Sequence, residues 1–206
     1  MSAQHYFSSS PDSDFKARTL SLDLAGHRVE VSTAAGIFSP AGLDKGSAVL
    51  LDKVPAPVGK LVLDIGSGWG PLTLALALKL PQARVIAVEV NQRSAELTRL
   101  NAARLGLDRV EVFQPDQVDP QLRFDTIWSN PPIRVGKQAL HKILLTWLPR
   151  LAPGGQAYLV VQKNLGADSL QAWLADRLEK DYPGRFAVSR YGSSKGFRLL
   201  RCASLH

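Results

Sequence analysis

A turn containing three glycines places the tightest constraint on how this chain can fold. The turn, Gly66-Ser67-Gly68-Trp69-Gly70, follows an apolar segment at residues 61–65 that has the length of a strand buried on both faces. A helical segment at residues 71–80 follows and begins with proline, which is tolerated at the first helical position. Glycine lets the backbone turn sharply and lets a ligand approach where a Cβ would clash, and the helix N-terminus then faces that ligand. The sequence therefore predicts a strand, a ligand-binding turn and a helix, the opening unit of an α/β fold.

The alternation of strand and helix continues beyond this first unit. The further predicted elements are strands at residues 84–90, 110–113, 124–129 and 156–161 and helices at residues 91–105, 137–148 and 167–180, with a turn at Pro153-Gly154-Gly155. Two last strands, at residues 186–191 and 197–202, are joined by residues 192–196 without a helix, so they should be antiparallel. We predict an α/β fold with a doubly wound, seven-stranded, mostly parallel sheet and helices on both faces.

The N-terminal quarter is expected to add a β-hairpin to this core. Residues 19–24 and 28–32 alternate weakly around the turn Ala25-Gly26-His27, and residues 44–53 resemble a short helix that Pro55 ends. We expect residues 1–55 to form an arm, the hairpin and the helix, packed on a core at residues 56–206. A chain of 206 residues suits a single structural domain.

The spacing of the glycines discriminates between cofactors. A nicotinamide-binding turn, G-x-G-x-x-G, would have glycine at position 71, whereas this chain has Pro71 and the pattern G-x-G-x-G. Asp64 precedes the turn, and Glu89 stands roughly 20 residues beyond Gly70, where an acid accepts hydrogen bonds from ribose hydroxyls. This combination resembles the first motif of class I S-adenosylmethionine-dependent methyltransferases.

The resemblance implies a cofactor, S-adenosylmethionine, and a set of residues that bind it. In that family Asp64 would face the amino acid moiety, Glu89 the ribose and Asp116 the adenine, although Asp116 also fits a simple turn. The expected cofactor-binding residues are Asp64, Gly66, Ser67, Gly68, Gly70, Glu89, Val90, Asp116 and Asn130.

Asn130-Pro131-Pro132 directly follows the predicted strand at residues 124–129, and we predict that it is catalytic. Proline fixes φ and removes N–H donors, so the segment is stiff and exposes carbonyls. Ligands bind beyond the carboxyl ends of such strands, which places Asn130 on the same edge as the glycine turn. A conjugated amino group is a poor nucleophile, and two acceptors, the Asn130 side-chain oxygen and the Pro131 carbonyl, would orient its two N–H groups. The alternative interpretation is an ordinary turn.

Four segments extend the resemblance over nearly the whole chain. They are His5-Tyr6-Phe7-Ser8, Gly36-Ile37-Phe38-Ser39, Gly42-Leu43-Asp44-Lys45-Gly46-Ser47 and Asn130-Pro131-Pro132-Ile133-Arg134. Together they resemble the methyltransferase small domain family, which includes guanine-N2 methyltransferases of small-subunit ribosomal RNA. The resemblance implies the sheet order 3-2-1-4-5-7-6 and places Phe38 and the segment from Asp44 to Ser47 beside the cofactor and target pocket. One departure is Ile133, where related Asn-Pro-Pro enzymes commonly have an aromatic residue that stacks on the base.

Charge points to a polyanionic partner. The formal net charge of +7 favours nucleic acid, although a solvated basic surface would give the same balance. Arg134 and Lys137 could contact phosphates beside a flipped base or could be solvated cations, and Lys163 leaves the fifth strand on the same edge. The expected substrate-binding residues are Phe38, Ile133, Arg134, Lys137 and Lys163.

The expected function is S-adenosylmethionine-dependent methylation of an exocyclic amine of a nucleobase, guanine N2 in ribosomal RNA. Two alternatives stay open: methylation of a protein glutamine amide, as in release-factor methyltransferases, and a catalytically silent cofactor-binding role in RNA assembly. A metal site is not expected, because Cys202 is the single cysteine and the four histidines lack ligand spacing. Neither a signal peptide nor a membrane span is indicated, and we expect a cytoplasmic monomer or weak homodimer.

Overall fold

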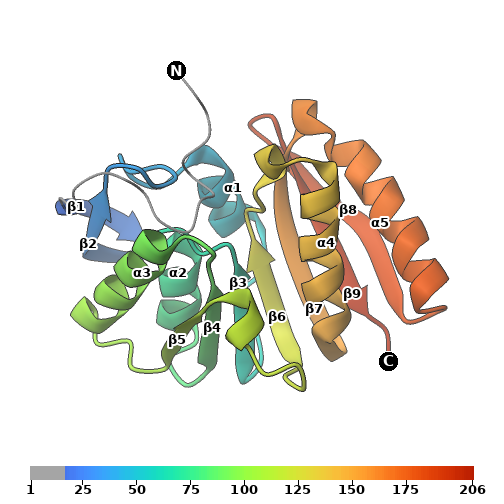
Figure 1. Cartoon of the computed structure of the whole chain (residues 1–206), viewed down its shortest axis with the longest axis horizontal. Helices are drawn as coiled ribbons and strands as arrows, with labels where there is room; N and C mark the ends of the chain where they lie inside the picture. The colour runs from blue at the N-terminus through green and yellow to red at the C-terminus, as the bar shows by residue number, and fades with distance from the viewer. Residues whose placement is uncertain (1–16) are drawn as a thin grey trace.

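In the computed structural model, residues 17–206 are described, and they form a seven-stranded sheet with helices on both faces (Figure 1). The expected N-terminal arm, with the segment at residues 5–8, lies outside the described residues. The strands of the main sheet are β3 (Leu61–Ile65), β4 (Arg84–Val88), β5 (Val110–Phe113), β6 (Phe124–Ser129), β7 (Leu151–Gln162), β8 (Phe186–Ser194) and β9 (Phe197–Ser204).

The strand order is β5-β4-β3-β6-β7-β9-β8, which confirms the predicted topology. Strands β3 to β7 run parallel to one another, and β9 is antiparallel to both β7 and β8. The carboxyl ends of all the parallel strands therefore meet at one edge of the sheet, toward which β6 points in Figure 1.

Both faces of the sheet are buried under helices, which explains why its strands are apolar without alternation. Leu63 and Ile127 pack with α4 and α5 on one face, while their chain neighbours Val62 and Trp128 pack with α1, α2 and α3 on the other. The helices are α1 (Lys45–Lys53), α2 (Pro71–Lys79), α3 (Gln92–Arg104), α4 (Lys137–Trp147) and α5 (Ala167–Asp181), with 3-10 turns η1 (Pro115–Gln117), η2 (Ile133–Val135), η3 (Leu148–Arg150) and η4 (Lys163–Leu165). In residues 17–206, none of these helices is both long and apolar enough to cross a membrane.

The predicted hairpin is present as a separate two-stranded sheet of β1 (Ala17–Leu24) and β2 (His27–Ala34). Ala25 and Gly26, with φ of 54° and 86°, both adopt the left-handed conformation that a two-residue type I′ turn requires. The hairpin is longer than predicted and lies beside α2 and α3 (Figure 1), with contacts from α3 to β2.

Several element boundaries differ from the prediction, three of them for reasons that the structure shows. Strand β4 ends at Val88, so Glu89 and Val90 lie in the loop that follows. Strand β7 begins at Leu151, because the predicted turn at residues 153–155 is an irregularity within the strand between two stretches that both pair with β6. Strand β8 continues to Ser194, since the two residues Lys195 and Gly196, both with positive φ, suffice to turn the chain into β9.

Candidate active site

The carboxyl edge of the sheet gathers the predicted site residues in a row. In strand order, Asp116 follows β5, Glu89 follows β4, Gly66 follows β3, Asn130 follows β6 and Lys163 follows β7. Since neighbouring strands lie about 4.8 Å apart, the row is roughly 19 Å long. Residues far apart in the sequence thus form one extended surface, and the glycine turn lies at its centre.

The backbone of the glycine turn leaves room for a ligand. Gly66, Gly68 and Gly70 have φ of 76°, 60° and 105°, which L side chains rarely adopt. A Cβ on Gly68 would meet no atom within 4 Å, so the turn presents bare backbone to open space. Helix α3 holds the turn from behind, because the Thr98 hydroxyl donates to the Gly68 carbonyl at 2.8 Å. The turn has the open backbone and helix N-terminus that the cofactor interpretation requires.

Asp64 lies beneath this turn and is wholly buried. Its Oδ2 accepts a hydrogen bond of 2.6 Å from the Thr73 hydroxyl, while Oδ1 has no partner among the described residues. Burial raises the pKa of Asp64 to about 7, the Thr73 hydrogen bond opposes this, and the charge of Glu89 adds to it. A buried carboxylate oxygen with no partner fits a site whose ligand brings a donor.

Glu89 contacts the glycine turn directly. Its Oε2 accepts the N–H of Gly68 and its Oε1 the N–H of Asn91, both at 2.8 Å. Burial raises the pKa of Glu89, and these backbone N–H groups oppose the rise. Each carboxylate oxygen keeps a lone pair for a further donor such as a ribose hydroxyl. Val90 and Asp116 are exposed farther along the same edge.

A cavity beside the turn brings Asn130 together with a segment that precedes α1. Phe38, half exposed at 51 %, stands at the same cavity and offers it an aromatic ring. The lining residues are Phe38, Ser39, Asp44, Ser47, Gly66, Ser67, Gly68, Trp69, Pro71, Leu72 and Asn130. The segment at residues 44–47, expected beside the pocket from the resemblance, therefore reaches this cavity through Asp44 and Ser47, although neither residue was among the expected site residues.

The side chain of Asn130 has a defined orientation. Its Nδ2 donates to Asp44 Oδ1 at 2.9 Å and to Ser47 Oγ at 3.3 Å. A carboxylate can only accept, so the amide nitrogen must face Asp44 and the amide oxygen must face away. Within residues 17–206 the Oδ1 atom of Asn130 forms no hydrogen bond, so it is free to accept one from a substrate.

The two prolines form a tight turn in which the Pro131 carbonyl already accepts one hydrogen bond, whereas a fully free carbonyl was expected. The Pro131 carbonyl accepts the N–H of Ile133 at 2.8 Å, in an inverse γ-turn centred on Pro132 with φ of −74° and ψ of 77°. One lone pair of that carbonyl remains for another donor. The side chain of Ile133 packs against the hydrophobic core that contains α4 and α5, and it does not line the cavity with Asn130.

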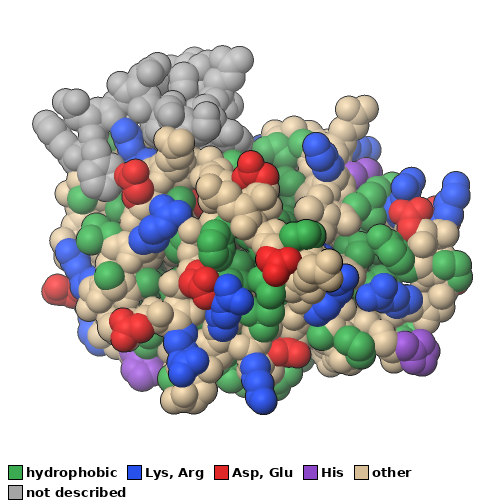
Figure 2. Space-filling model, turned by 60° about the horizontal axis from the view of Figure 1, so that its bottom comes forward, with side chains coloured by type: hydrophobic (Ala, Val, Ile, Leu, Met, Phe, Trp, Pro, Cys, Tyr) green, Lys and Arg blue, Asp and Glu red, His purple; other side chains and the backbone are tan. Residues whose placement is uncertain are grey.

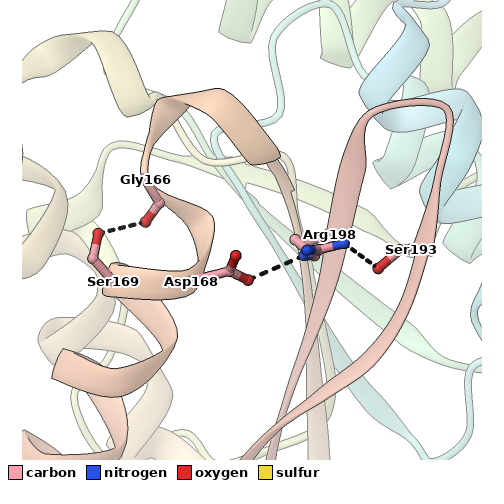
Figure 3. A network of polar contacts seen from close by, with 5 residues as sticks. All are labelled: Gly166, Asp168, Ser169, Ser193 and Arg198. Atoms are coloured by element: carbon pink, nitrogen blue, oxygen red, sulfur yellow. Dashed lines mark hydrogen bonds and ion pairs between the residues drawn. The ribbon is translucent and has the colours of Figure 1, made fainter.

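A second cavity lies at the end of β7. It is lined by Gln162, Lys163, Asn164, Asp168 and Gly196. Figure 3 shows how its wall is fixed: Arg198 donates to Asp168 Oδ1 at 3.0 Å and to Ser193 Oγ at 2.8 Å.

Cations surround this second cavity. Arg198, with Arg190 and Lys163 nearby, lowers the pKa of Asp168. Arg134 and Lys137, near the Asn130 turn, are exposed.

In residues 17–206 there is no group of three or more His, Cys, Asp or Glu side chains arranged to hold a metal.

Comparison with known proteins decides the family. Residues 28–187 match the family described as "methyltransferase small domain". The chain belongs to this family. The predicted resemblance is therefore confirmed for most of the chain, including most of strand β2, the glycine turn and the Asn130 turn.

Individual relatives differ in length. The chain is 34% identical over 203 residues to an uncharacterized protein of Bacillus subtilis (strain 168), YbxB, covering 97% of this chain and 98% of the relative. It is 38% identical over 160 residues to ribosomal RNA small subunit methyltransferase C of Pseudomonas aeruginosa (strain LESB58), covering 75% of this chain but 48% of that protein. This member of the methyltransferase small domain family thus spans about half the length of the ribosomal RNA methyltransferases that it matches.

Solved structures agree with this assignment. The structure of the T. thermophilus 16S rRNA N2 methyltransferase RsmC, in complex with AdoMet and guanosine, superposes with a TM-score of 0.74 at 25% identity. The match covers 94% of this chain and 52% of that chain. A methyltransferase from Pyrococcus furiosus, at 23% identity and a TM-score of 0.60, shares the fold. The predicted class I methyltransferase fold is confirmed.

Proposed function

We propose that this chain transfers a methyl group to an exocyclic amine of a nucleobase, namely N2 of guanine in ribosomal RNA. Membership of the family makes the chain a methyltransferase, and its cofactor is S-adenosylmethionine. The observation that carries the proposal is the orientation of Asn130, whose amide oxygen is left free at a cavity shared with the glycine turn. Relatives named as small-subunit ribosomal RNA methyltransferases support the choice of RNA.

We assign different roles to residues at different positions along the edge of the sheet. Asp64, the glycine turn and Glu89 would bind the cofactor, which supplies a methyl group already activated on a sulfonium. Asn130 Oδ1 and the second lone pair of the Pro131 carbonyl would accept the two N–H groups of the target amine. These acceptors hold the nitrogen toward the methyl group and stabilise the positive charge that develops on it.

Phe38 would take the stacking role that Ile133 cannot. Ile133 is half-buried against the core, whereas Phe38 is half exposed at the cavity that Asn130 lines. An aromatic ring beside a flipped base contributes stacking that an aliphatic side chain does not. The proposal therefore assigns the base to the space between Phe38 and Asn130.

Exposed cations flank this space and would contact the RNA backbone. Arg134 and Lys137 follow the Asn130 turn, and Lys163 lines the second cavity at the end of β7. Phosphate contacts of this kind position a nucleic acid without reading its sequence. The target position would then depend on the shape of the RNA around the flipped base.

A methyl-transfer assay with tritiated S-adenosylmethionine tests the proposal. We expect label in small-subunit ribosomal RNA, naked or assembled, and N2-methylguanosine after digestion. Release factor, offered as the substrate in a parallel reaction, should stay unlabelled. If cofactor binding is confirmed and RNA stays unlabelled under all these conditions, the proposal is wrong. Label in release factor instead would favour the glutamine-amide alternative.

A further inference from the structure

Asp44 has two carboxylate oxygens in different situations. Oδ1 accepts three hydrogen bonds: from the N–H of Gly46 at 2.8 Å, from the N–H of Ser47 at 3.1 Å and from Asn130 Nδ2 at 2.9 Å. Oδ2 forms no hydrogen bond within residues 17–206, and the half-buried side chain lines the same cavity as Asn130. One oxygen therefore fixes the local structure, while the other remains an acceptor.

The first turn of α1 holds this pair of side chains tightly. A Cβ on Gly46 would lie 3.1 Å from Asp44 Oδ1, 3.2 Å from Asn130 Nδ2 and 3.2 Å from a ring carbon of Phe197. Such distances are shorter than ordinary van der Waals contact, so a larger residue at position 46 would require its neighbours to shift by a few tenths of an ångström. Asp44 and Asn130 are thus held side by side between α1 and the end of β6.

The free acceptors of this pair match one nucleobase edge. Guanine presents two adjacent donors, the ring N1–H and the N2 amine, whereas adenine presents an amine beside an unprotonated N1 that can only accept. Asn130 Oδ1 and Asp44 Oδ2 are both acceptors. If Asp44 Oδ2 faced the N1 atom of adenine, two acceptors would meet with no hydrogen between them. Such an unpaired polar contact discriminates strongly against adenine.

We propose that Asp44 selects guanine: its Oδ1 orients the amide of Asn130, and its Oδ2 accepts the N1–H of the target base. This inference rests on the proposed function and adds to it a residue that recognises the base. Asp44 binds the substrate through Oδ2 and acts as a positioning residue for Asn130 through Oδ1.

Two substitutions separate this role from simple helix capping. Asp, Asn and Ser all cap a helix N-terminus well, so neither Asp44→Asn nor Asp44→Ser should unfold α1. Asp44→Asn keeps an acceptor for Asn130 but replaces Oδ2 with a donor. Asp44→Ser keeps the cap but is too short to reach both Asn130 and the base. Asp52→Asn, an exposed change of the same charge at the other end of α1, is the matched control.

The substrate probes are guanosine and 2-aminopurine riboside, which keeps the 2-amino group but has an acceptor at N1. With the cofactor-loaded full chain, we expect guanosine to bind at least about tenfold more tightly than 2-aminopurine riboside in chemical-shift titrations. Asp44→Asn should abolish that preference and lower kcat/KM for ribosomal RNA by about tenfold or more, with unchanged Tm and cofactor affinity. The control should behave as the unmodified chain.

Asp44→Ser should lose the guanosine preference as Asp44→Asn does, and it should also lower kcat. The side-chain NH2 group of Asn130 should exchange its hydrogens faster in Asp44→Ser, whereas in Asp44→Asn it should stay protected. If Asp44→Asn keeps both the guanosine preference and the kcat/KM, Asp44 is only a helix cap and the inference is wrong. Equal binding of the two nucleosides, or binding of neither, also contradicts it. Because binding is measured without turnover, absence of RNA methylation would overturn the proposed function separately.

Discussion

At the scale of single residues, Asp64 combines an unfavourable environment with a proposed binding role. It is wholly buried, and burial raises the pKa of its carboxyl to about 7, well above that of an unfolded chain. Between about pH 4 and pH 7 the folded protein therefore holds a proton that the unfolded chain releases. The free energy of unfolding should fall as the pH rises through this window and level off above it.

Asp64→Asn tests this reasoning. The amide keeps an acceptor for the Thr73 hydroxyl but carries no charge, so the variant should lose the fall in stability. At pH 8 it should be more stable than the unmodified protein by on the order of 2–4 kcal/mol, with little difference near pH 4. Its cofactor affinity should be lower. Urea unfolding between pH 4 and pH 8 and calorimetric titration measure both effects; an unchanged difference in stability across that range would contradict the account.

Sequence patterns were sufficient for some site residues and not for others. The glycine turn, Asp64, Glu89 and Asn130 stand at fixed offsets from predicted strands, so the fold alone brings them to one edge. The bond between Asp44 and Asn130 joins residues 86 positions apart and depends on how α1 docks on the sheet. The family resemblance placed the segment from Asp44 to Ser47 beside the pocket, but no local pattern in the sequence predicts the bond from Asn130 to Asp44.

At the scale of elements, α3 joins the hairpin to the glycine turn. The buried side chain of Asn101 accepts the N–H of Ser32 at 2.6 Å and donates to the carbonyls of Ser32 and Trp69, both at 2.9 Å. Three backbone groups in two separate elements thus depend on one side chain. A polar residue on the buried side of a helix is the sequence signal for such a role.

Asn101→Ala should therefore lower both stability and cofactor affinity. Leaving these buried backbone groups without partners should reduce the free energy of unfolding by about 3 kcal/mol. The turn at Trp69 would loosen, and cofactor binding should weaken with it. Arg104→Ala, an exposed change on the same helix, should alter stability by less than about 0.5 kcal/mol. Equal values for the two variants in denaturant unfolding and calorimetric titration would show that Asn101 does not join these elements.

Element types were predictable because apolar runs, caps and glycines are local signals. The predicted boundaries were wrong where pairing with a neighbouring strand determines where a strand begins or ends. Pro153-Gly154-Gly155 has the composition of a turn, yet Leu151 before it and Gln156 after it both pair with β6, so the strand continues through an irregularity. The β8–β9 connection was predicted too long, because register and two positive φ angles let Lys195 and Gly196 suffice.

At the scale of the whole molecule, the sheet topology determines which candidate site residues lie side by side. The order of the parallel strands puts the glycine turn beside Asn130, and short right-handed connections leave few alternative orders. The face opposite the site edge, turned forward in Figure 2, carries Lys and Arg mixed with Asp and Glu. The proposed RNA contacts thus rely on cations near the cavities rather than on net charge alone. The division at residue 55, the oligomeric state and the cytoplasmic location stay predictions.

Nucleoside mass spectrometry of small-subunit ribosomal RNA tests the central claim most directly. The RNA would come from cells that contain the unmodified protein, the Asn130→Ala variant or neither. The account predicts one N2-methylguanosine that is present with the unmodified protein and absent in the other two, although the variant still binds S-adenosylmethionine. The same modification in all three samples, or its full retention with Asn130→Ala, would contradict it.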